Sequence, residues 1–143
     1  MTVNQALLKR IAKRFRQEKT IGDAIFNGVP GIIYLIDAEG MAVRWNRRLT
    51  ESTGYSDEEI GQLHCLEYFR GADAELIAQK VAQTLTDGSS DAEVEFYRKD
   101  GSHFSIYLTS VRVIIDGKPH IAGVGIDISE RRRAVEALAR SEA

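Results

Sequence analysis

The stretch Ile121–Arg133, near the C-terminal end, constrains the fold more than any other part of the chain. Its first eight residues alternate as in a β-strand that carries apolar side chains on both faces, and such strands lie in the middle of a sheet. Gly123 and Gly125 leave one face without side chains, so another group can approach the backbone there. Ser129 is predicted to cap a helix that begins at Glu130. A central strand that leads directly into a helix couples the sheet to the segment that leaves the domain.

Composition excludes several classes of protein. The 143 residues and the hydrophobic fraction of 43% fit one domain with one core and terminal additions. The formal net charge of −2 gives no argument for a nucleic-acid or membrane partner. No apolar run approaches the ~20 residues of a membrane span, and the N-terminus lacks the apolar core of a signal peptide. The lone cysteine, Cys65, fits a reducing compartment, so we expect a cytoplasmic protein.

The residues from Val3 to Lys19 have the apolar spacing of an amphipathic helix. Thr2 and Gln5 form the capping-box pattern that begins such a helix. Its apolar stripe consists of Val3, Leu7, Leu8, Ile11, Ala12 and Phe15, with basic residues beside it. A basic amphipathic helix can lie on a membrane, but we favour packing on the chain's own domain or on a partner chain. A second, short helix is expected from Thr20 to Asn27.

The rest of the chain alternates between strand and helix patterns. β-branched and aromatic residues predict strands at Gly31–Ile36, Met41–Trp45, Ala92–Arg98, His103–Ile115 and His120–Ile128. The period is helical from Asn46 to about Asp87 and again from Glu130 to Ala143. Two hairpin groups that flank a helical insertion describe an α+β fold. We predict a five-stranded antiparallel sheet with the insertion on one face, plus N- and C-terminal amphipathic helices.

Cap residues mark the helix ends inside the insertion. Ser56 and Glu59 make a second capping box. Asp73 is placed to cap a longer helix, and Gly88 lies just past the end of that helix. These signals predict a short helix followed by a long one.

Several ordered blocks resemble a PAS domain. The first half of the likeness rests on Asp37-Ala-Glu-Gly40, Trp45-Asn46-Arg47 and Thr53-Gly54-Tyr55-Ser56-Asp57-Glu58-Glu59-Ile60. The second half rests on Phe96-Tyr97-Arg98-Lys99-Asp100-Gly101 and Gly123-Val124-Gly125-Ile126-Asp127-Ile128-Ser129-Glu130-Arg131. The resemblance covers about residues 22–133 and is specific for the fold. PAS domains are mostly sensory or dimerisation modules inside larger signalling proteins, and their ligands vary.

The resemblance implies a pocket between one sheet face and the helical insertion. On the sheet side, the candidate pocket residues are Phe96, Ile106, Leu108, Ile121, Gly123 and Gly125. On the insertion side, they are Tyr68, Phe69, Ile77 and Val81. The alternative is that these side chains fill a core and leave no cavity. The other sheet face, with Val124 and Ile126, needs a cover, and the N-terminal helix is the best candidate.

The sequence argues against the flavin-binding LOV subfamily of PAS domains. LOV domains carry a reactive cysteine in a Gly-Arg-Asn-Cys-Arg-Phe-Leu-Gln stretch, and Cys65 lies at a matching position. Leu66 replaces the phosphate-binding arginine, however, and Gly125 replaces the glutamine that would bind the flavin ring. FMN would therefore leave its polar groups buried without partners.

Haem, metal and catalytic sites have no support in the sequence either. Haem needs an axial ligand, usually histidine, and His64, His103 and His120 all lie outside the long helix at Asp73–Asp87 that often supplies it in haem-binding PAS domains. No cysteine or histidine spacing is typical of a metal site. No phosphate-binding glycine loop or nucleophile elbow is present. We expect no enzyme activity from this segment.

These observations predict a sensory PAS module of a larger cytosolic signalling protein. We expect a small ligand between the sheet and the helices, and the sequence does not specify its kind. The alternative is a module that binds no ligand and only dimerises. We expect an N-terminal dimerisation helix at residues 1–19, a PAS domain at 20–129 and a signalling helix from 130. The candidate interface of a homodimer consists of Leu7, Leu8, Ile11, Phe15, Val124 and Ile126. Asp127 and Ser129 form the candidate signal exit toward an output domain, either a histidine kinase or a cyclic-dinucleotide enzyme.

Overall fold

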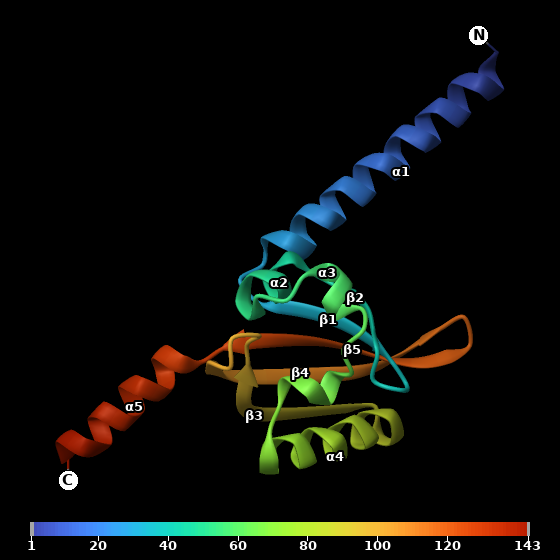
Figure 1. The fold of residues 1–143 in the computed structure, drawn as a ribbon. Coiled ribbons are helices and arrows are strands. Elements are labelled where there is room, and N and C mark those ends of the chain that lie inside the picture. Colours follow the sequence, from blue (N-terminus) through green and yellow to red (C-terminus); the bar gives the residue numbers. More distant parts are fainter. Residues whose placement is uncertain (1, 143) are drawn as a thin grey trace.

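A computed structural model describes residues 2–142, and the side chains of Phe15, Glu18 and Glu142 lie outside this description. The elements follow the expected order (Figure 1). The helices are α1 (Val3–Gly28), α2 (Arg47–Thr53), α3 (Asp57–Ile60), the 3-10 helix η1 (Cys65–Tyr68), α4 (Gly71–Asp87) and α5 (Ser129–Glu142). The strands are β1 (Ile32–Asp37), β2 (Ala42–Trp45), β3 (Ser89–Tyr97), β4 (His103–Ile115) and β5 (Lys118–Asp127).

Within these residues the strands form a five-stranded antiparallel sheet in the order β2-β1-β5-β4-β3. β5 lies at the centre, between β1 and β4, as the apolar residues on both of its faces predicted. Its register places Gly123 opposite Tyr34 of β1 and Ser110 of β4. The central strand therefore contacts both halves of the sheet before it leads into α5.

The helical insertion covers one face of the sheet, and the hydrophobic core lies between them. α4 packs against β3 and also contacts η1 (Figure 1). The buried core consists of Ile32, Leu49, Ile60, Tyr68, Phe69, Ile77, Val94, Phe96, Phe104, Ile106 and Leu108. Its strand members occupy alternate positions, as the inner face of a sheet requires. The predicted α+β class and the position of the insertion are confirmed.

α1 is one continuous helix, so the prediction of two helices that meet near residue 20 was wrong. Thr20 lies inside this helix, where its hydroxyl donates to the carbonyl oxygen of Arg16 at 2.8 Å. Gly22 lowers helix propensity by only about 1 kcal/mol relative to alanine, which is too little to interrupt a long helix. The capping box of Thr2 and Gln5 forms as predicted.

α1 extends away from the sheet (Figure 1). Within this chain it therefore does not cover the outer sheet face at Val124 and Ile126, which corrects one of our expectations. Those two side chains are 38% and 49% exposed. The last turns of α1 do contact the body, where Arg44 pairs with Asp23 at 3.2 Å. The rest of α1 leaves the outer face of the sheet without a cover among residues 2–142.

Asn46 fixes the end of α1 to the sheet. Its side chain is almost fully buried, at 1% exposed. The amide nitrogen donates to the carbonyl oxygens of Phe26 and Gly31 at 2.9 Å each, and the amide oxygen accepts from the N–H of Ile33 at 3.0 Å. These bonds satisfy backbone groups where α1 ends and β1 begins.

Two predicted caps have other roles. Asp73 lies in the first turn of α4, whose N-cap is Arg70, and the Asp73 carboxylate accepts from the N–H of Glu95 at 3.0 Å. Ser129 belongs to the first turn of α5, and the carboxylate of Asp127 accepts the N–H of Ser129 at 2.9 Å. Both predictions erred because sequence spacing does not show which distant backbone groups compete for a side chain. The Ser56–Glu59 box forms as predicted.

Candidate functional site

A cavity of about 90 Å³ lies between the inner sheet face and the helical insertion. Seven of the ten predicted pocket residues line it: Tyr68, Phe69, Ile77, Val81, Phe96, Leu108 and Ile121. They come from η1, the segment after it, α4 and the three strands β3, β4 and β5. The structure thus brings most of the candidate residues together around one hollow.

The two glycines and Ile106 do not line the cavity, which corrects the idea that the glycines provide its space. The ring of Tyr34 lies over Gly123, where an added Cβ would also come within 2.7 Å of the Thr109 carbonyl oxygen. An added Cβ at Gly125 would come within 2.7 Å of Ile106. Neighbouring side chains therefore already use the room that the glycines leave.

The cavity also has walls that the sequence analysis missed. The further lining residues are Ile32, Tyr34, Ile36, Gly40, Ala42, Leu49, Leu63, Cys65, Lys80, Thr84, Ser90, Asp91, Ala92 and Ser110. Several belong to β1 and β2, which the sequence analysis identified as strands without placing them beside the pocket. The period-two pattern of β1 together with its pairing to β5 was the signal that could have placed Ile32, Tyr34 and Ile36 there.

Two hydroxyl pairs in the wall satisfy each other. The hydroxyl groups of Tyr34 and Ser110 lie 2.7 Å apart. Those of Thr84 and Ser90 also lie 2.7 Å apart, and Thr84 donates to the carbonyl oxygen of Lys80 at 2.8 Å. Burial raises the pKa of Tyr34, although the bond with Ser110 opposes this effect. These groups are therefore neutral and already have hydrogen-bond partners.

The hydroxyl of Tyr68 is different, because it is buried and has no hydrogen-bond partner within the described residues. The residue is 8% exposed. Its ring stacks on Phe96 with centroids 4.9 Å apart and meets Tyr55 edge-on at 5.9 Å. Burial, with smaller effects from Tyr55, Glu67 and Cys65, raises the pKa of Tyr68. The group stays protonated and can donate a hydrogen bond.

Cys65 lines the cavity at the start of η1. Burial raises the pKa of its thiol from an ordinary 9.0 to about 11, so the thiol is neutral at physiological pH. The preceding residue, His64, contacts the thiol, with its Nδ1 3.9 Å from the sulfur. The same Nδ1 accepts from the N–H of Leu66, and Nε2 lies 2.7 Å from the carbonyl oxygen of Glu39. The site holds an unreactive thiol beside a histidine that is engaged by the backbone.

Neither haem nor a flavin fits this wall. No histidine is among the described side chains that line the cavity, so haem would lack its usual axial ligand there. A volume of about 90 Å³ is smaller than the ~150 Å³ that admits benzene, and a flavin ring is several times larger than benzene. Across residues 2–142, no three His, Cys, Asp or Glu side chains gather as a metal site would require.

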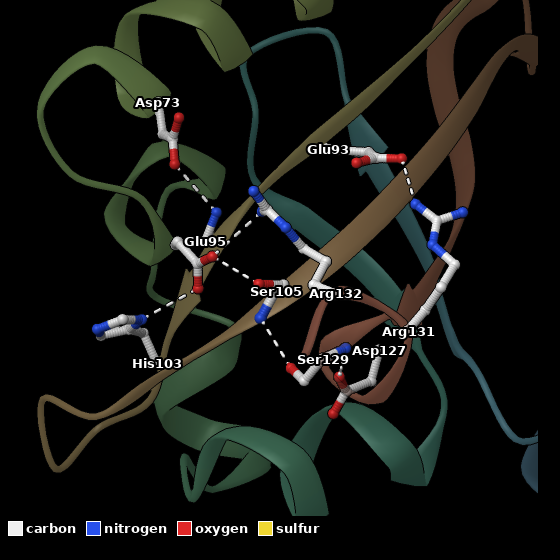
Figure 2. A network of polar contacts seen from close by, with 9 residues as sticks. All are labelled: Asp73, Glu93, Glu95, His103, Ser105, Asp127, Ser129, Arg131 and Arg132. Carbon is white, nitrogen blue, oxygen red and sulfur yellow. Dashed lines mark hydrogen bonds and ion pairs between the residues drawn. The ribbon is translucent and has the colours of Figure 1, made fainter. Parts of the chain in front are cut away.

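A second cluster of polar contacts joins the sheet to α5 (Figure 2). The hydroxyl of Ser129 accepts from the N–H of Ser105 in β4 at 3.1 Å, while the carboxylate of Asp127 holds the N–H of Ser129. Arg131 pairs with Glu93 of β3 at 2.7 Å. Both predicted exit residues thus take part in fixing the first turn of α5 to β3 and β4.

Glu95 is the centre of this cluster, and the sequence analysis did not identify it. Its carboxylate accepts from the Ser105 hydroxyl at 2.6 Å and from Nδ1 of His103 at 3.0 Å, and it pairs with Arg132 at 3.5 Å (Figure 2). Its backbone N–H donates to Asp73 of α4. Burial is the largest single influence and raises the pKa of Glu95, but the hydrogen bonds from Ser105 and His103 and the electrostatic effects of His103 and Arg132 together lower it. Glu95 thus links α4, two strands and α5.

The predicted interface residues lie apart from the cavity, at the surface. Leu7, Leu8 and Ile11 are 52%, 65% and 57% exposed along α1. The side chain of Phe15 lies outside the described residues. Val124 and Ile126 are exposed on the outer sheet face, and Val111 of β4, 50% exposed, joins them there. In the part of the chain that the structure describes, no helix is both long and apolar enough to cross a membrane.

Comparison with known proteins gives one consistent result. A family model described as "PAS domain" matches residues 30–130. The fold is similar to the PAS domain of an HTR-like protein from Haloarcula marismortui, with a TM-score of 0.74 and 26% identity over 84% of this chain and 99% of that one. It is also similar to a PAS domain from Colwellia psychrerythraea (TM-score 0.69, 23% identity, 78% and 97% coverage).

A third similar structure is a domain of a sensory box sensor histidine kinase/response regulator from Geobacter sulfurreducens. It has a TM-score of 0.65 and 22% identity over 77% of this chain and 94% of that one. No curated protein matches this chain. The similar proteins therefore identify the fold more sharply than they identify a ligand or an output.

Proposed function

The chain belongs to the PAS domain family, and we propose that it senses a small ligand in the inner cavity and passes the signal to an output domain through α5. As a PAS domain it is a sensory segment rather than a catalytic one. The observation that carries the proposal is the cavity of about 90 Å³, lined mainly by apolar side chains from both the sheet and the insertion. Voids larger than a water molecule are few in natural cores.

The route of the signal follows residues that neighbour the cavity. Phe96 lines the cavity, and the preceding residue, Glu95, points to the opposite face of β3 and contacts Arg132 of α5. Asp73 ties the first turn of α4, whose later residues also line the cavity, to the same point. A ligand that moves α4 against β3 would therefore change how α5 is held.

The proposal includes a homodimer formed through α1 and the outer sheet face. The stripe at Leu7, Leu8 and Ile11 has little to pack on within its own chain, and a helix of this kind is stabilised mainly by packing of its apolar face. Two copies would cover each other's stripes and sheet faces with two-fold symmetry. α5 would then lead toward an output domain such as a histidine kinase or a cyclic-dinucleotide enzyme. The lone cysteine supports a cytoplasmic setting.

A cavity-filling substitution tests the ligand site. Ala92 lines the cavity from β3, and Ala92→Leu should block ligand uptake while the domain keeps or raises its melting temperature, because the added carbons fill a void. Native mass spectra and absorption spectra of freshly purified wild-type protein should show a retained small molecule that Ala92→Leu loses.

The matched control is Ala78→Leu, which adds the same atoms at an exposed position of α4 and should retain the ligand. Should Ala92→Leu unfold the domain, the cavity would be too tightly packed to receive a ligand. Wild-type protein that carries and binds nothing would favour the alternative function, a module that only dimerises.

A further inference from the structure

We propose that the cavity takes a small uncharged molecule with a hydrogen-bond acceptor, such as a carbonyl group, and that the hydroxyl of Tyr68 donates to this acceptor. The inference rests on the proposed function, since it assumes that the cavity is a ligand site. It adds the chemical class of the ligand and the residue that selects it.

The argument begins with the missing partner of Tyr68. Its hydroxyl has no hydrogen-bond partner within the described residues, and the residue is 8% exposed, so bulk water does not supply one. The stacked ring of Phe96 and the edge contact with Tyr55 hold the Tyr68 ring in place. A buried polar group without a partner lowers stability. Because Tyr68 forms part of the cavity wall, a molecule inside the cavity can provide the partner.

The other hydroxyl groups of the wall are less available to a ligand, because they already have hydrogen-bond partners. The hydroxyl of Tyr34 is paired with Ser110, and that of Thr84 is paired with Ser90. Of the two charged residues in the wall, Lys80 and Asp91, the second is exposed and already accepts from the hydroxyl of Tyr107 at 2.8 Å. The rest of the wall is mainly apolar, and burial of an unpaired charge there is costly. The wall therefore favours an uncharged molecule with one polar group.

A water molecule is a poorer partner than a carbonyl group. Buried waters typically make two to four hydrogen bonds, whereas the ring of Phe96, which stacks on Tyr68, offers no strong acceptor or donor. A carbonyl oxygen needs only one donor, and its carbon skeleton matches the apolar remainder of the cavity. The volume of about 90 Å³ is smaller than the ~150 Å³ that admits benzene, so the ligand has fewer non-hydrogen atoms than benzene, about four.

The experiment compares two probes of nearly equal shape, acetone and 2-methylpropene, in wild-type protein and in Tyr68→Phe. Each dissociation constant is measured by NMR titration at one pH. Tyr68→Phe should weaken acetone binding by about tenfold and change 2-methylpropene binding by less than about twofold. For each probe, the dissociation constant in Tyr68→Phe is divided by that in wild type. Because the hydration of a free probe is the same in both measurements, it cancels in this ratio. In addition, ligand-free Tyr68→Phe should melt at a higher temperature than wild type, because an unsatisfied buried hydroxyl has been removed.

The outcomes separate this inference from the proposed function. If both probes bind and Tyr68→Phe affects them equally, the cavity remains a ligand site but the inference about Tyr68 is wrong. A lower melting temperature for Tyr68→Phe would likewise show that the hydroxyl already has a partner, and it would overturn the inference. If neither probe binds to wild type or to Tyr68→Phe up to the highest soluble concentration, both the inference and the ligand-sensing function are contradicted.

Discussion

At the scale of single residues, the cavity wall combines groups with similar burial and different chemistry. Tyr34 and Tyr68 are both neutral phenols, yet Ser110 satisfies the first while the second has no partner in the described chain. Cys65 has the position of a photochemically active cysteine in LOV domains, but its environment opposes thiolate formation. The position of a residue in the sequence therefore does not determine its reactivity, because burial and neighbouring groups set the pKa of its side chain.

The thiol of Cys65 should react slowly with iodoacetamide near neutral pH. A pKa of about 11 in place of 9.0 reduces the thiolate fraction roughly a hundredfold, and only the thiolate attacks. The labelling rate should rise about tenfold per pH unit up to about pH 11, while urea-unfolded protein reacts at the ordinary rate. Mass spectrometry of timed samples gives both rates. Equal rates for folded and unfolded protein at pH 7.5 would show that the thiol is not shielded.

At the scale of secondary-structure elements, β3 connects the cavity to α5. Its alternate residues point to opposite faces, so Phe96 contacts the cavity while Glu93 and Glu95 contact α5. A displacement of this strand would therefore change both the cavity wall on one face and the contacts with α5 on the other. α4 is coupled to the same strand by the bond between Asp73 and the N–H of Glu95.

Glu95→Gln should loosen the first turn of α5, because the amide keeps an acceptor for Ser105 and loses the charge that attracts Arg132. We expect a stability loss of about 0.5 kcal/mol, as for a partly exposed ion pair, and faster hydrogen exchange of the α5 amides. Glu136→Gln, which removes the same charge from an exposed position of α5, is the control. Unchanged exchange in Glu95→Gln would argue against a role for Glu95 in holding α5.

The pH dependence of the same contact follows from the lowered pKa of Glu95. A carboxyl group whose pKa is lower in the folded state stabilises that state above its unfolded pKa, and the effect is lost as the pH falls through the folded value. The ordinary pKa is 4.5, so wild type should approach the stability of Glu95→Gln below that pH. Thermal melts of both proteins between pH 3 and pH 7 measure the convergence.

At the scale of the whole molecule, apolar surface remains exposed in separate places. α1 carries one stripe, the outer sheet face carries Val111, Val124 and Ile126, and α5 carries Val135 and Leu138. α1 and α5 both extend away from the sheet (Figure 1). Such surfaces on a small domain are typical of interaction sites. The homodimer proposed above would cover α1 and the sheet face.

Wild-type protein should therefore be a dimer at micromolar concentration. The double variant Leu8→Glu with Ile11→Glu should weaken association at least a hundredfold, because burial of each such side chain contributes about 1.5–3 kcal/mol. Sedimentation velocity measures both proteins. Lys9→Glu, on the basic side of the same helix, is the control and should remain dimeric. A monomeric wild type, or a double variant that stays dimeric, would refute this assembly.

The sequence by itself determined the fold class, the central position of β5 and part of the cavity wall. Alternation of apolar residues is a local pattern, and it specifies which side chains of a strand share a face. For this reason Phe96, Leu108 and Ile121 were placed correctly on the inner face. The capping box of Ser56 and Glu59 also depends only on residues three apart, and it formed as predicted.

Only the tertiary structure decided how the inner space is filled and which polar groups meet. Tyr34 comes from a strand far from Gly123 in sequence, and only strand pairing shows that its ring covers that glycine. The contacts of Glu95 with Ser105 and Arg132 likewise join separate elements. A residue's type and spacing limit what it can contact, but its actual partners depend on how distant segments pack. This packing places the Tyr68 hydroxyl in the cavity wall without a partner among the described residues, and it brings Glu95 into contact with α5.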